Sequence, residues 1–275
     1  MPEMPEVETV RRDLDRLVRG RRIDEVIVTG ARTVRRTSAT AVRTGLIGRT
    51  ITGTGRRGKY LLVDLDDGNQ VLVHLRMSGQ LLVGPASTPL AVHTHVRLVL
   101  DDGRDLRFVD PRTFGEVAVI DPDQLGRDAP DLAALGPEPL DIDRKAFAAI
   151  IRARSRQLKA LLTDQRVVAG IGNIYADEIA FAARLRHDRV GSGLTTAEVG
   201  RLHGEMQRIL GAAIEARGST LRDAQYVDLG GLSGGYQANH HVYDREGELC
   251  HRCGREITRV PSGGRSTYFC RRCQR

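Results

Sequence analysis

Hydrophobic residues change their spacing along the chain, and these changes predict where helices give way to strands. Near the amino terminus, apolar residues recur at helical spacing after Pro5 and early acidic residues, and Gly20 follows as a stop, which predicts one helix. From there to about residue 121, short alternating runs separated by Asp-Gly turns predict strands, which at this spacing are typical of a β-sandwich or barrel. The strands are expected at 25–29, 59–65, 70–75, 95–100 and 105–109.

The second half of the chain has a helical pattern. A segment rich in Pro, Asp and Gly between 121 and 141 is typical of a linker, and apolar periodicity then predicts helices at about 144–165, 174–184 and 196–217. The glycine-rich stretch 228–237 is expected to be a mobile loop. These patterns indicate an α+β protein with a β-rich domain at 2–121, a linker at 122–143, a helical domain at 144–239 and a terminal module at 240–275.

Charge and composition narrow the class of partner. The chain has 42 Lys and Arg residues against 35 Asp and Glu residues, a formal net charge of +7. This surplus suits a polyanion, because basic side chains that meet phosphates release condensed counterions, although a well-solvated basic surface explains it equally well. No apolar run approaches the roughly 20 residues that cross a bilayer, and the amino terminus lacks a signal-peptide pattern. We therefore expect a cytoplasmic protein with no membrane partner.

The cysteines form a metal-binding pattern. All four lie near the carboxyl terminus, in two Cys-x₂-Cys pairs that are 16 residues apart. Four thiolates complete a tetrahedral Zn²⁺ site with no open position, so this spacing predicts a structural zinc; a redox pair or disulfides remain the alternatives. His251 is a competing ligand but is expected at the surface. The predicted ligands are Cys250, Cys253, Cys270 and Cys273.

The segment between the cysteine pairs predicts a β-hairpin, with strands at 257–260 and 266–269 around a Pro-Ser-Gly-Gly turn. Seven arginines lie in or beside this hairpin, a density that suits contacts with phosphates.

Six separated motifs resemble the formamidopyrimidine-DNA glycosylase family over essentially the whole chain. They are the start Pro-Glu-Met-Pro-Glu-Val-Glu, Arg-Arg-Gly-Lys-Tyr at 56–60, His-Leu-Arg-Met-Ser-Gly at 74–79, Asp-Pro-Arg-Thr-Phe-Gly at 110–115, Val-Ala-Gly-Ile-Gly-Asn-Ile-Tyr at 168–175 and the cysteine hairpin with Arg265. The resemblance implies a β-sandwich domain joined to a helical domain that has a helix–two-turn–helix motif, a lesion-capping loop at 219–237 and a zinc hairpin. It also implies damaged double-stranded DNA as partner, and we expect a monomer that associates with the bacterial nucleoid.

The family resemblance implies a bifunctional glycosylase and lyase for oxidised purines. Pro2, freed by removal of Met1, is then the Schiff-base nucleophile, and Glu3 is the general acid and base. Lys59, expected on a strand, is assigned the proton transfer of β-elimination, and Arg265 grips phosphate and assists δ-elimination. Without the resemblance, Pro2 and Glu3 would be interpreted as a helix leader and a helix-start acid. Lys59 would be interpreted as an exposed strand lysine and Arg265 as a solvated hairpin arginine.

The same resemblance implies a set of DNA contacts. A base must leave the stack before its glycosidic bond is reached, and Met77, Arg112 and Phe114 match the residues that fill the vacated space, although Met77 and Phe114 alone would suit a core. Asn173 is expected at a helix N-cap, where free amides favour a phosphate. The remaining contacts are His74, His93, and Arg154 and Lys159 on the preceding helix.

Three departures from the family leave the preferred lesion open. Arg76 stands where the family usually has glycine, Thr113 where a second arginine is frequent, and Gln237 where an aromatic follows Gly-Tyr. An endonuclease VIII-like glycosylase for oxidised pyrimidines is therefore an alternative. A non-catalytic zinc-finger protein that binds DNA is a second alternative, and it would have no need of Pro2 and Glu3.

Overall fold

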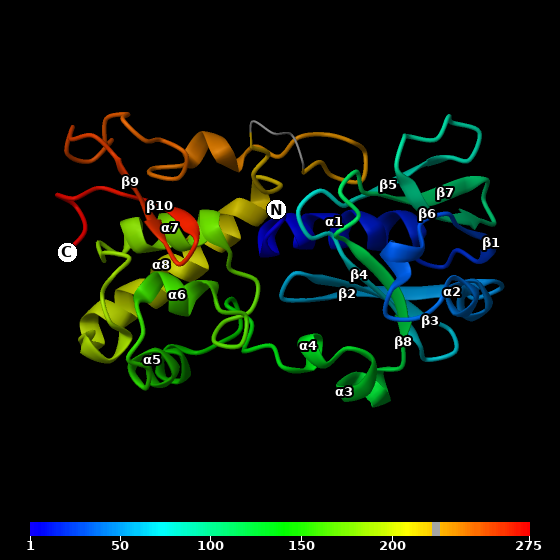
Figure 1. Ribbon diagram of the computed structural model, residues 1–275, viewed down its shortest axis with the longest axis horizontal. Helices are drawn as coiled ribbons and strands as arrows, with labels where there is room; N and C mark the ends of the chain where they lie inside the picture. The colour runs from blue at the N-terminus through cyan, green and yellow to red at the C-terminus, as the bar shows by residue number, and fades with distance from the viewer. Residues whose placement is uncertain (222–225) are drawn as a thin grey trace. The chain divides into compact units, whose positions relative to one another are not determined.

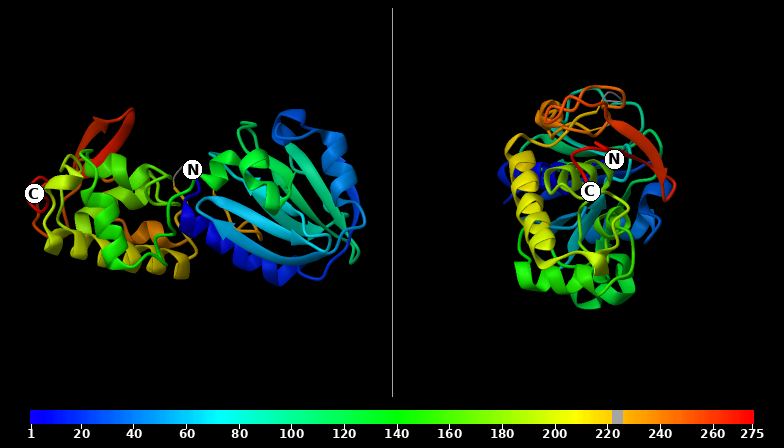
Figure 2. Two further views of the ribbon diagram at one scale, coloured as in Figure 1. Left: turned by 90° about the horizontal axis from the view of Figure 1, so that it is seen from below. Right: turned by 90° about the vertical axis from the view of Figure 1, so that its left-hand side faces the viewer.

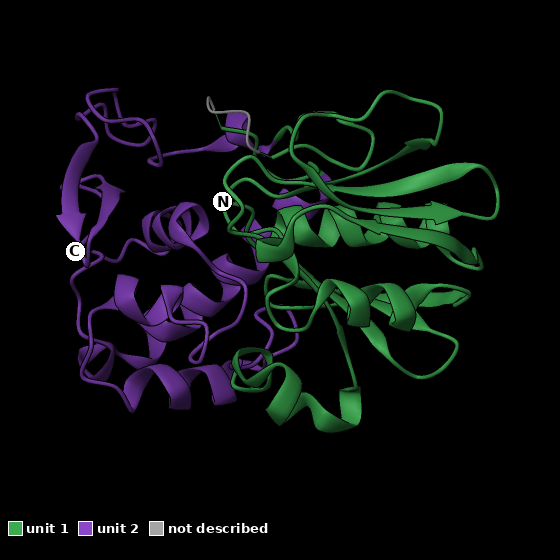
Figure 3. Cartoon of the chain, turned by 45° about the vertical axis from the view of Figure 1, so that its right-hand side comes forward, with its two compact units in different colours: residues 1–134, 216–235 green, residues 135–215, 236–275 purple. Residues whose placement is uncertain are grey.

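A computed structural model (Figure 1) describes residues 1–221 and 226–275 of the chain. Contacts divide the chain into two compact units, which Figure 3 shows in green and purple. Unit 1 comprises 1–134 and 216–235, and unit 2 comprises 135–215 and 236–275. Four residues of the expected loop at 219–237 lie outside the described residues.

Unit 1 begins with helix α1 (Met4–Val18), as the apolar periodicity predicts. Pro5 lies in its first turn, where the missing N–H has no cost. Its buried face carries Val7, Val10, Leu14 and Val18, which join the core of the unit. Gly20 follows with φ +79°, a left-handed conformation that favours glycine, and ends the helical path.

Unit 1 also contains two four-stranded antiparallel sheets, which confirm the predicted sandwich (Figure 1). The first has the order β1 (Ile23–Val28), β6 (Thr94–Leu100), β7 (Arg104–Val109), β5 (Gln80–Pro85). The second has the order β2 (Ile51–Arg57), β3 (Tyr60–Leu65), β4 (Gln70–His74), β8 (Glu116–Ile120). The short helices η1 (Ala31–Val34) and α2 (Ala39–Leu46) connect β1 to β2.

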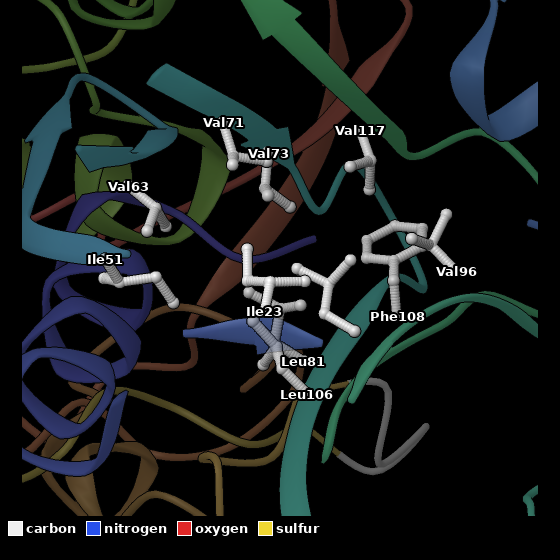
Figure 4. A pocket seen from close by; sticks show the side chains of 11 residues that line it. Ile23, Ile51, Val63, Val71, Val73, Leu81, Val96, Leu106, Phe108 and Val117 are labelled. Carbon is white, nitrogen blue, oxygen red and sulfur yellow. The ribbon is translucent and has the colours of Figure 1, made fainter. Parts of the chain in front are cut away.

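The space between the two sheets is filled by apolar side chains. A cavity of about 20 Å³ remains there. Figure 4 shows the Val, Ile and Leu side chains and Phe108 that line it. A space this small with an apolar lining stays dry and holds no ligand.

Two segments differ from the expected domain boundaries. The expected linker contains η2 (Pro122–Gln124), α3 (Leu125–Asp128) and α4 (Pro130–Ala133), and residues up to 134 belong to unit 1. We expected the loop at 219–237 within the helical domain, but residues 216–235 group with unit 1. The physical reason is burial, because Tyr226 and Leu229 lie in the apolar core beside the strands.

Unit 2 is helical, with a two-stranded ribbon at its end, drawn in red in Figures 1 and 2. Its elements are α5 (Arg144–Arg152), α6 (Leu158–Thr163), α7 (Asn173–Ala182), η3 (Gly191–Gly193), α8 (Thr196–Glu215), η4 (Tyr236–Asn239), β9 (Thr258–Ser262) and β10 (Arg265–Phe269).

The prediction of one continuous helix at 144–165 is wrong, because residues 153–157 separate α5 from α6. Their carbonyl groups accept hydrogen bonds from another segment: Gly191 N donates to Arg156 O at 2.9 Å, and Ser192 N donates to Arg154 O at 3.0 Å.

Candidate active site and zinc module

Hydrogen bonds hold the residues at the start of α1 in place. Pro2 and Glu3 are both buried, whereas Met1 ahead of them is 42% exposed. Glu3 is the N-cap of α1, and its N–H donates to Glu6 Oε2 at 2.8 Å. Glu6 Oε1 accepts in turn from Ser219 N at 2.7 Å. These bonds hold the first residues in one position, which suits a residue whose backbone nitrogen is to react.

Lys59 lies in the two-residue turn between β2 and β3, not on the strand where we expected it. Its side chain is buried, with 6% exposure. Arg56 ties this turn to α1: its guanidinium donates to Gly58 O at 2.9 Å and lies 3.3 Å from Glu8 Oε2. The turn that carries the predicted lysine is therefore attached to the helix that carries Pro2 and Glu3.

His74 lies opposite Tyr60 in the pairing of β3 and β4, and their ring centroids are 4.4 Å apart. Burial lowers the pKa of His74 well below its usual value, and the positive charges of Arg76 and Lys59 lower it further. The imidazole is therefore neutral at pH 7, and its Nδ1 accepts a hydrogen bond from Arg76 N at 3.0 Å.

Because the pKa of His74 is depressed in the folded protein, acid should destabilise unit 1. The unfolded chain takes up a proton near the ordinary histidine pKa of 6.5, and the folded protein does not. The stabilising contribution is complete above that pH and is lost as the pH falls toward the folded-state pKa. We expect His74→Asn to reduce the slope of unfolding free energy against pH below 6.5 in urea titrations, because its side-chain oxygen can accept from Arg76 N without titrating. An unchanged slope would contradict this assignment.

The predicted space-filling residues lie in exposed loops of unit 1. Met77 and Phe114 are 41% and 46% exposed, so a core role for either is wrong. The Arg112 guanidinium carbon lies 4.9 Å from the Phe114 ring centroid, so the cation and the aromatic side chain form one group. His93 is also exposed.

Two of the departures lie at left-handed backbone positions of these loops. Arg76 has φ +53° and Thr113 has φ +55°. Residues with a Cβ rarely adopt this conformation, which is why glycine is favoured at such a position. The neighbouring Met77 and Phe114 are thus presented by strained turns.

Lys159 is nearly buried in unit 2 and is paired with an acid. Its Nζ lies 2.5 Å from Asp177 Oδ1, and both side chains are nearly inaccessible. Asp177 Oδ2 also accepts from Tyr268 N of β10 at 3.0 Å, so the pair connects α6, α7 and the ribbon. Burial raises the pKa of Asp177 to about 7, against the opposing effects of Lys159 and the Tyr268 N–H.

Removing one partner of this pair should destabilise unit 2 strongly. Lys159→Met leaves the Asp177 carboxylate buried without its cation, and breaking such a pair costs about 3–5 kcal/mol. We expect that loss in the unfolding free energy measured by urea denaturation. The exposed pair of Arg156 and Asp164, 2.7 Å apart, is the matched control, and Arg156→Met should change stability by less than about 1 kcal/mol. Equal effects of the two substitutions would contradict the structural role of Lys159.

The other predicted contacts of unit 2 differ in their placement. Asn173 is the first residue of α7, and Gly172 is the cap, so the predicted N-cap position is wrong by one residue. Arg154 lies in the break between α5 and α6, not on a helix, and donates to Ile150 O at 2.6 Å. Arg265 is exposed at the start of β10 and lines an open cleft with Arg156 and Lys159.

The four cysteines come together at the base of the ribbon. The four Sγ atoms all lie within 4.8 Å of one another, which fits a tetrahedral Cys₄ set around Zn²⁺. The closest Sγ pairs are 3.4 and 3.9 Å apart, far beyond a disulfide bond of about 2.05 Å. His251 is exposed and stands outside this group, with its Nδ1 3.3 Å from Arg245. The residues therefore fit one structural metal ion.

Models of three protein domains match the chain in order. They are the formamidopyrimidine-DNA glycosylase N-terminal domain at 1–117, the formamidopyrimidine-DNA glycosylase H2TH domain at 135–225, and the zinc finger found in FPG and IleRS at 247–275. The chain belongs to the formamidopyrimidine-DNA glycosylase family. It is therefore a DNA glycosylase of base-excision repair, and its four cysteines hold one structural Zn²⁺.

Individual members of the family match over their full length. The chain is 41% identical to formamidopyrimidine-DNA glycosylase of Desulforamulus reducens, over 100% of this chain and 99% of the relative. It is 47% identical to that of Moorella thermoacetica, over 94% of each. Among solved structures, Lactococcus lactis Fpg in complex with DNA that contains an abasic site has a TM-score of 0.91, 35% identity and 99% coverage of both chains. The MutM (Fpg) protein of Thermus thermophilus has a TM-score of 0.89 and 42% identity, and covers 99% of this chain and 98% of that one.

This family fold contains buried acids that the sequence reasoning missed. Glu6, Asp110 and Glu116 in unit 1 and Glu178 in unit 2 are nearly inaccessible, and each accepts hydrogen bonds from loop backbone or arginine side chains. Glu6 and Asp110 lie within the family motifs, and Glu116 and Glu178 lie shortly after two of them, so their position in or near a motif was the available signal. Among residues 1–221 and 226–275, no helix is both long and apolar enough to span a membrane.

Proposed function

We propose that the chain excises oxidised purines, such as 8-oxoguanine and formamidopyrimidines, from double-stranded DNA and then nicks the strand by β,δ-elimination. Pro2 is the nucleophile and Glu3 its acid–base partner. Lys59 and Arg265 assist the eliminations. One copy of the chain acts on one lesion, in the bacterial cytoplasm at the nucleoid.

The observation that carries this proposal is the burial of Pro2 and Glu3 at the start of α1, together with the tether that attaches the Lys59 turn to the same helix. A flexible leader would be exposed and would have no such tether. Solved relatives support the substrate class: Lactococcus lactis Fpg has been crystallised with Fapy-dG DNA, and MutM with carbocyclic 8-oxo-G DNA.

The chemistry of a proline terminus accounts for both steps. Once Met1 is removed, the secondary amine has a pKa near that of other α-amines, about 7.7–8, so a useful neutral fraction exists in the cell. The nitrogen lone pair attacks C1′ of the damaged nucleotide, the base leaves with a proton, and the sugar ring opens with help from Glu3. The resulting iminium has no N–H to lose and stays cationic.

That iminium then serves as an electron sink for strand scission. Loss of a C2′ proton expels the 3′ phosphate, and a second elimination expels the 5′ phosphate. We assign Lys59 to the proton transfer of the first elimination and Arg265 to the phosphate of the second.

Binding of the damaged duplex is assigned to both units. Met77, Arg112 and Phe114 fill the space that the extruded base leaves. The basic cleft lined by Arg156 and Arg265, with Lys159 at its floor, suits a phosphate. His74, His93, Arg154 and Asn173 complete the set of contacts we propose.

Borohydride trapping tests the covalent step. Protein shown by mass spectrometry to lack Met1 is mixed with 8-oxoguanine duplex and reduced, and a protein–DNA adduct is expected. Pro2→Gly should give much less of it, since glycine supplies a primary amine. Absence of any adduct and any incision would refute the enzyme mechanism and favour a non-catalytic zinc-finger protein.

The same assay with a thymine glycol duplex tests the lesion class. Preferential incision of 8-oxoguanine supports the purine assignment, and incision of the pyrimidine lesion alone would favour the endonuclease VIII-like alternative.

A further inference from the structure

A single buried carboxylate connects the loops that present the space-filling residues. Asp110 has no exposed surface. Its Oδ1 accepts from the hydroxyl of Ser78 at 2.5 Å and from Arg112 N at 3.2 Å, and its Oδ2 accepts from Gly115 N at 2.7 Å. Ser78 is also buried and directly follows Met77 in the loop between β4 and β5. The bond between Ser78 and Asp110 therefore joins the loop of Met77 to the loop of Arg112 and Phe114.

The backbone of Asp110 reaches the third loop with a predicted DNA contact. Asp110 N donates to His93 O at 3.0 Å. Asp110 O accepts from His95 Nε2 at 2.9 Å and from Thr113 N at 3.2 Å. Loops from three parts of unit 1 thus meet at one residue.

The packing around Asp110 leaves the loops little room to move. A Cβ at Gly115 would lie 2.5 Å from the Phe108 ring and 3.1 Å from Asp110 Oδ2. A Cβ at Gly79 would lie 2.5 Å from Leu75 O and 3.0 Å from the same ring. Gly115 and Gly79 therefore pack closely against the Phe108 ring, and neither position has room for a side chain.

We propose that Asp110 is a positioning residue that holds Met77, Arg112 and Phe114 as one preassembled wedge, with Ser78 as the link between the two loops. This inference rests on the proposed function. Inserting side chains into a duplex requires unstacking, and a wedge that is already ordered loses less conformational freedom when it enters. The carboxylate is needed because three donors converge on it, two of them buried, and an asparagine amide offers only one acceptor oxygen.

Ser78→Ala is the sharpest test, because it removes the link between the loops and leaves the backbone bonds to Asp110 in place. Thr33→Val is the matched control for a buried hydroxyl, since Thr33 Oγ1 has no hydrogen-bond partner among the described residues. Ser38→Ala is the control for lost stability, since it removes the N-cap bond of α2 to Ala41 N, away from these loops. Asp110→Asn is a second variant, which replaces the two acceptor oxygens of the carboxylate with one.

The measurements separate insertion from chemistry. Fluorescence of 2-aminopurine beside the lesion reports unstacking on mixing, and product gels report base release. We expect Ser78→Ala to slow both by roughly tenfold, the effect of about one hydrogen bond to a charged group. Nicking of a duplex with a preformed abasic site, which has no base to extrude, should change by less than about twofold. Both control variants should match the parent protein in all three assays.

The outcomes distinguish this inference from the proposed function. A parent protein that releases no oxidised base shows that the proposed function is wrong. A parent that is active, with Ser78→Ala equal to it in fluorescence and base release, overturns the positioning role of Asp110 alone. A Ser78→Ala variant that loses abasic-site nicking as severely as base release also overturns it, because the residue is then merely structural.

Discussion

Replacing Glu3 with glutamine should lower the rate of base release by about 10²–10⁴-fold, the range that a positioned general acid and base contributes. Glutamine has nearly the same size and keeps an acceptor oxygen, but it neither gives nor takes a proton at physiological pH. The substitution also keeps the hydrogen bond from the Glu3 N–H to Glu6 Oε2, so the start of α1 should stay in place. The loss should therefore appear in activity and not in folding.

Single-turnover assays with the 8-oxoguanine duplex measure this loss, and thermal unfolding checks the fold. On a preformed abasic site the base has already left, so Glu3→Gln should retain more of its nicking activity there than on the intact lesion. Asp15→Asn is a matched control, because Asp15 is another carboxylate of α1 and accepts from the Thr54 hydroxyl at 3.2 Å. Asp15→Asn should act at the parent rate. Full base release by folded Glu3→Gln protein would remove Glu3 from the mechanism.

The parts of the fold that the sequence predicted are those with a local signal. Helix α1 shows its apolar face in the order of its own residues, and the zinc ribbon shows its turn and cysteine spacing. Strand β2 lacked such a signal, because after Ile51 it runs Thr-Gly-Thr-Gly-Arg-Arg. It becomes a strand through its pairing with β3, where Thr54 lies opposite Val63. Pairing of this kind depends on the partner and is absent from local propensity.

The same distinction applies to the candidate site. Ser78 and Asp110 each lie in one of the motifs, but they are 32 residues apart, and the hydrogen bond between them forms only in the folded protein. The burial of Lys159 also could not be predicted, since a lysine between Leu158 and Ala160 is equally consistent with an exposed position on a helix. Its partner Asp177 lies on another helix. Contacts that join distant loops thus required the structure.

Loss of the zinc ion should unfold the carboxyl-terminal module and abolish strand cleavage. The module has a small core that consists of Phe181, Val242, Ile257, Tyr268 and two of the metal ligands. Cores of this size rarely fold without a metal ion or a disulfide. Binding of structural Zn²⁺ contributes about 10–16 kcal/mol to the folding free energy of small zinc-binding domains at pH 7. Without the ion, β9 and β10 should lose their pairing, and the exposed Arg265 at the start of β10 should lose its fixed position.

Hydrogen exchange measured before and after chelation tests this expectation. Exchange should rise sharply over Thr258–Ser262 and Arg265–Phe269, while α8 and the strands of unit 1 keep their protection. Cys270→Ser, which alters a fully buried ligand, should reproduce the effect without chelator. His251→Ala should bind one zinc per chain and retain activity, because His251 lies outside the ligand group. Zinc affinity should also weaken as the pH falls, since protons compete for the thiolates.

Arg265→Ala distinguishes the effect of losing the zinc ion from the effect of losing the Arg265 side chain. This variant should retain zinc and a protected ribbon but lose the second elimination, so that its product ends differ from those of the parent protein. Chelated protein should instead lose cleavage altogether, because it loses the order of the whole ribbon beside the basic cleft. If stripped protein kept both its exchange protection and its cleavage activity, the metal would have no structural role, and the packing of the ribbon against α7 would have to be sufficient to hold it.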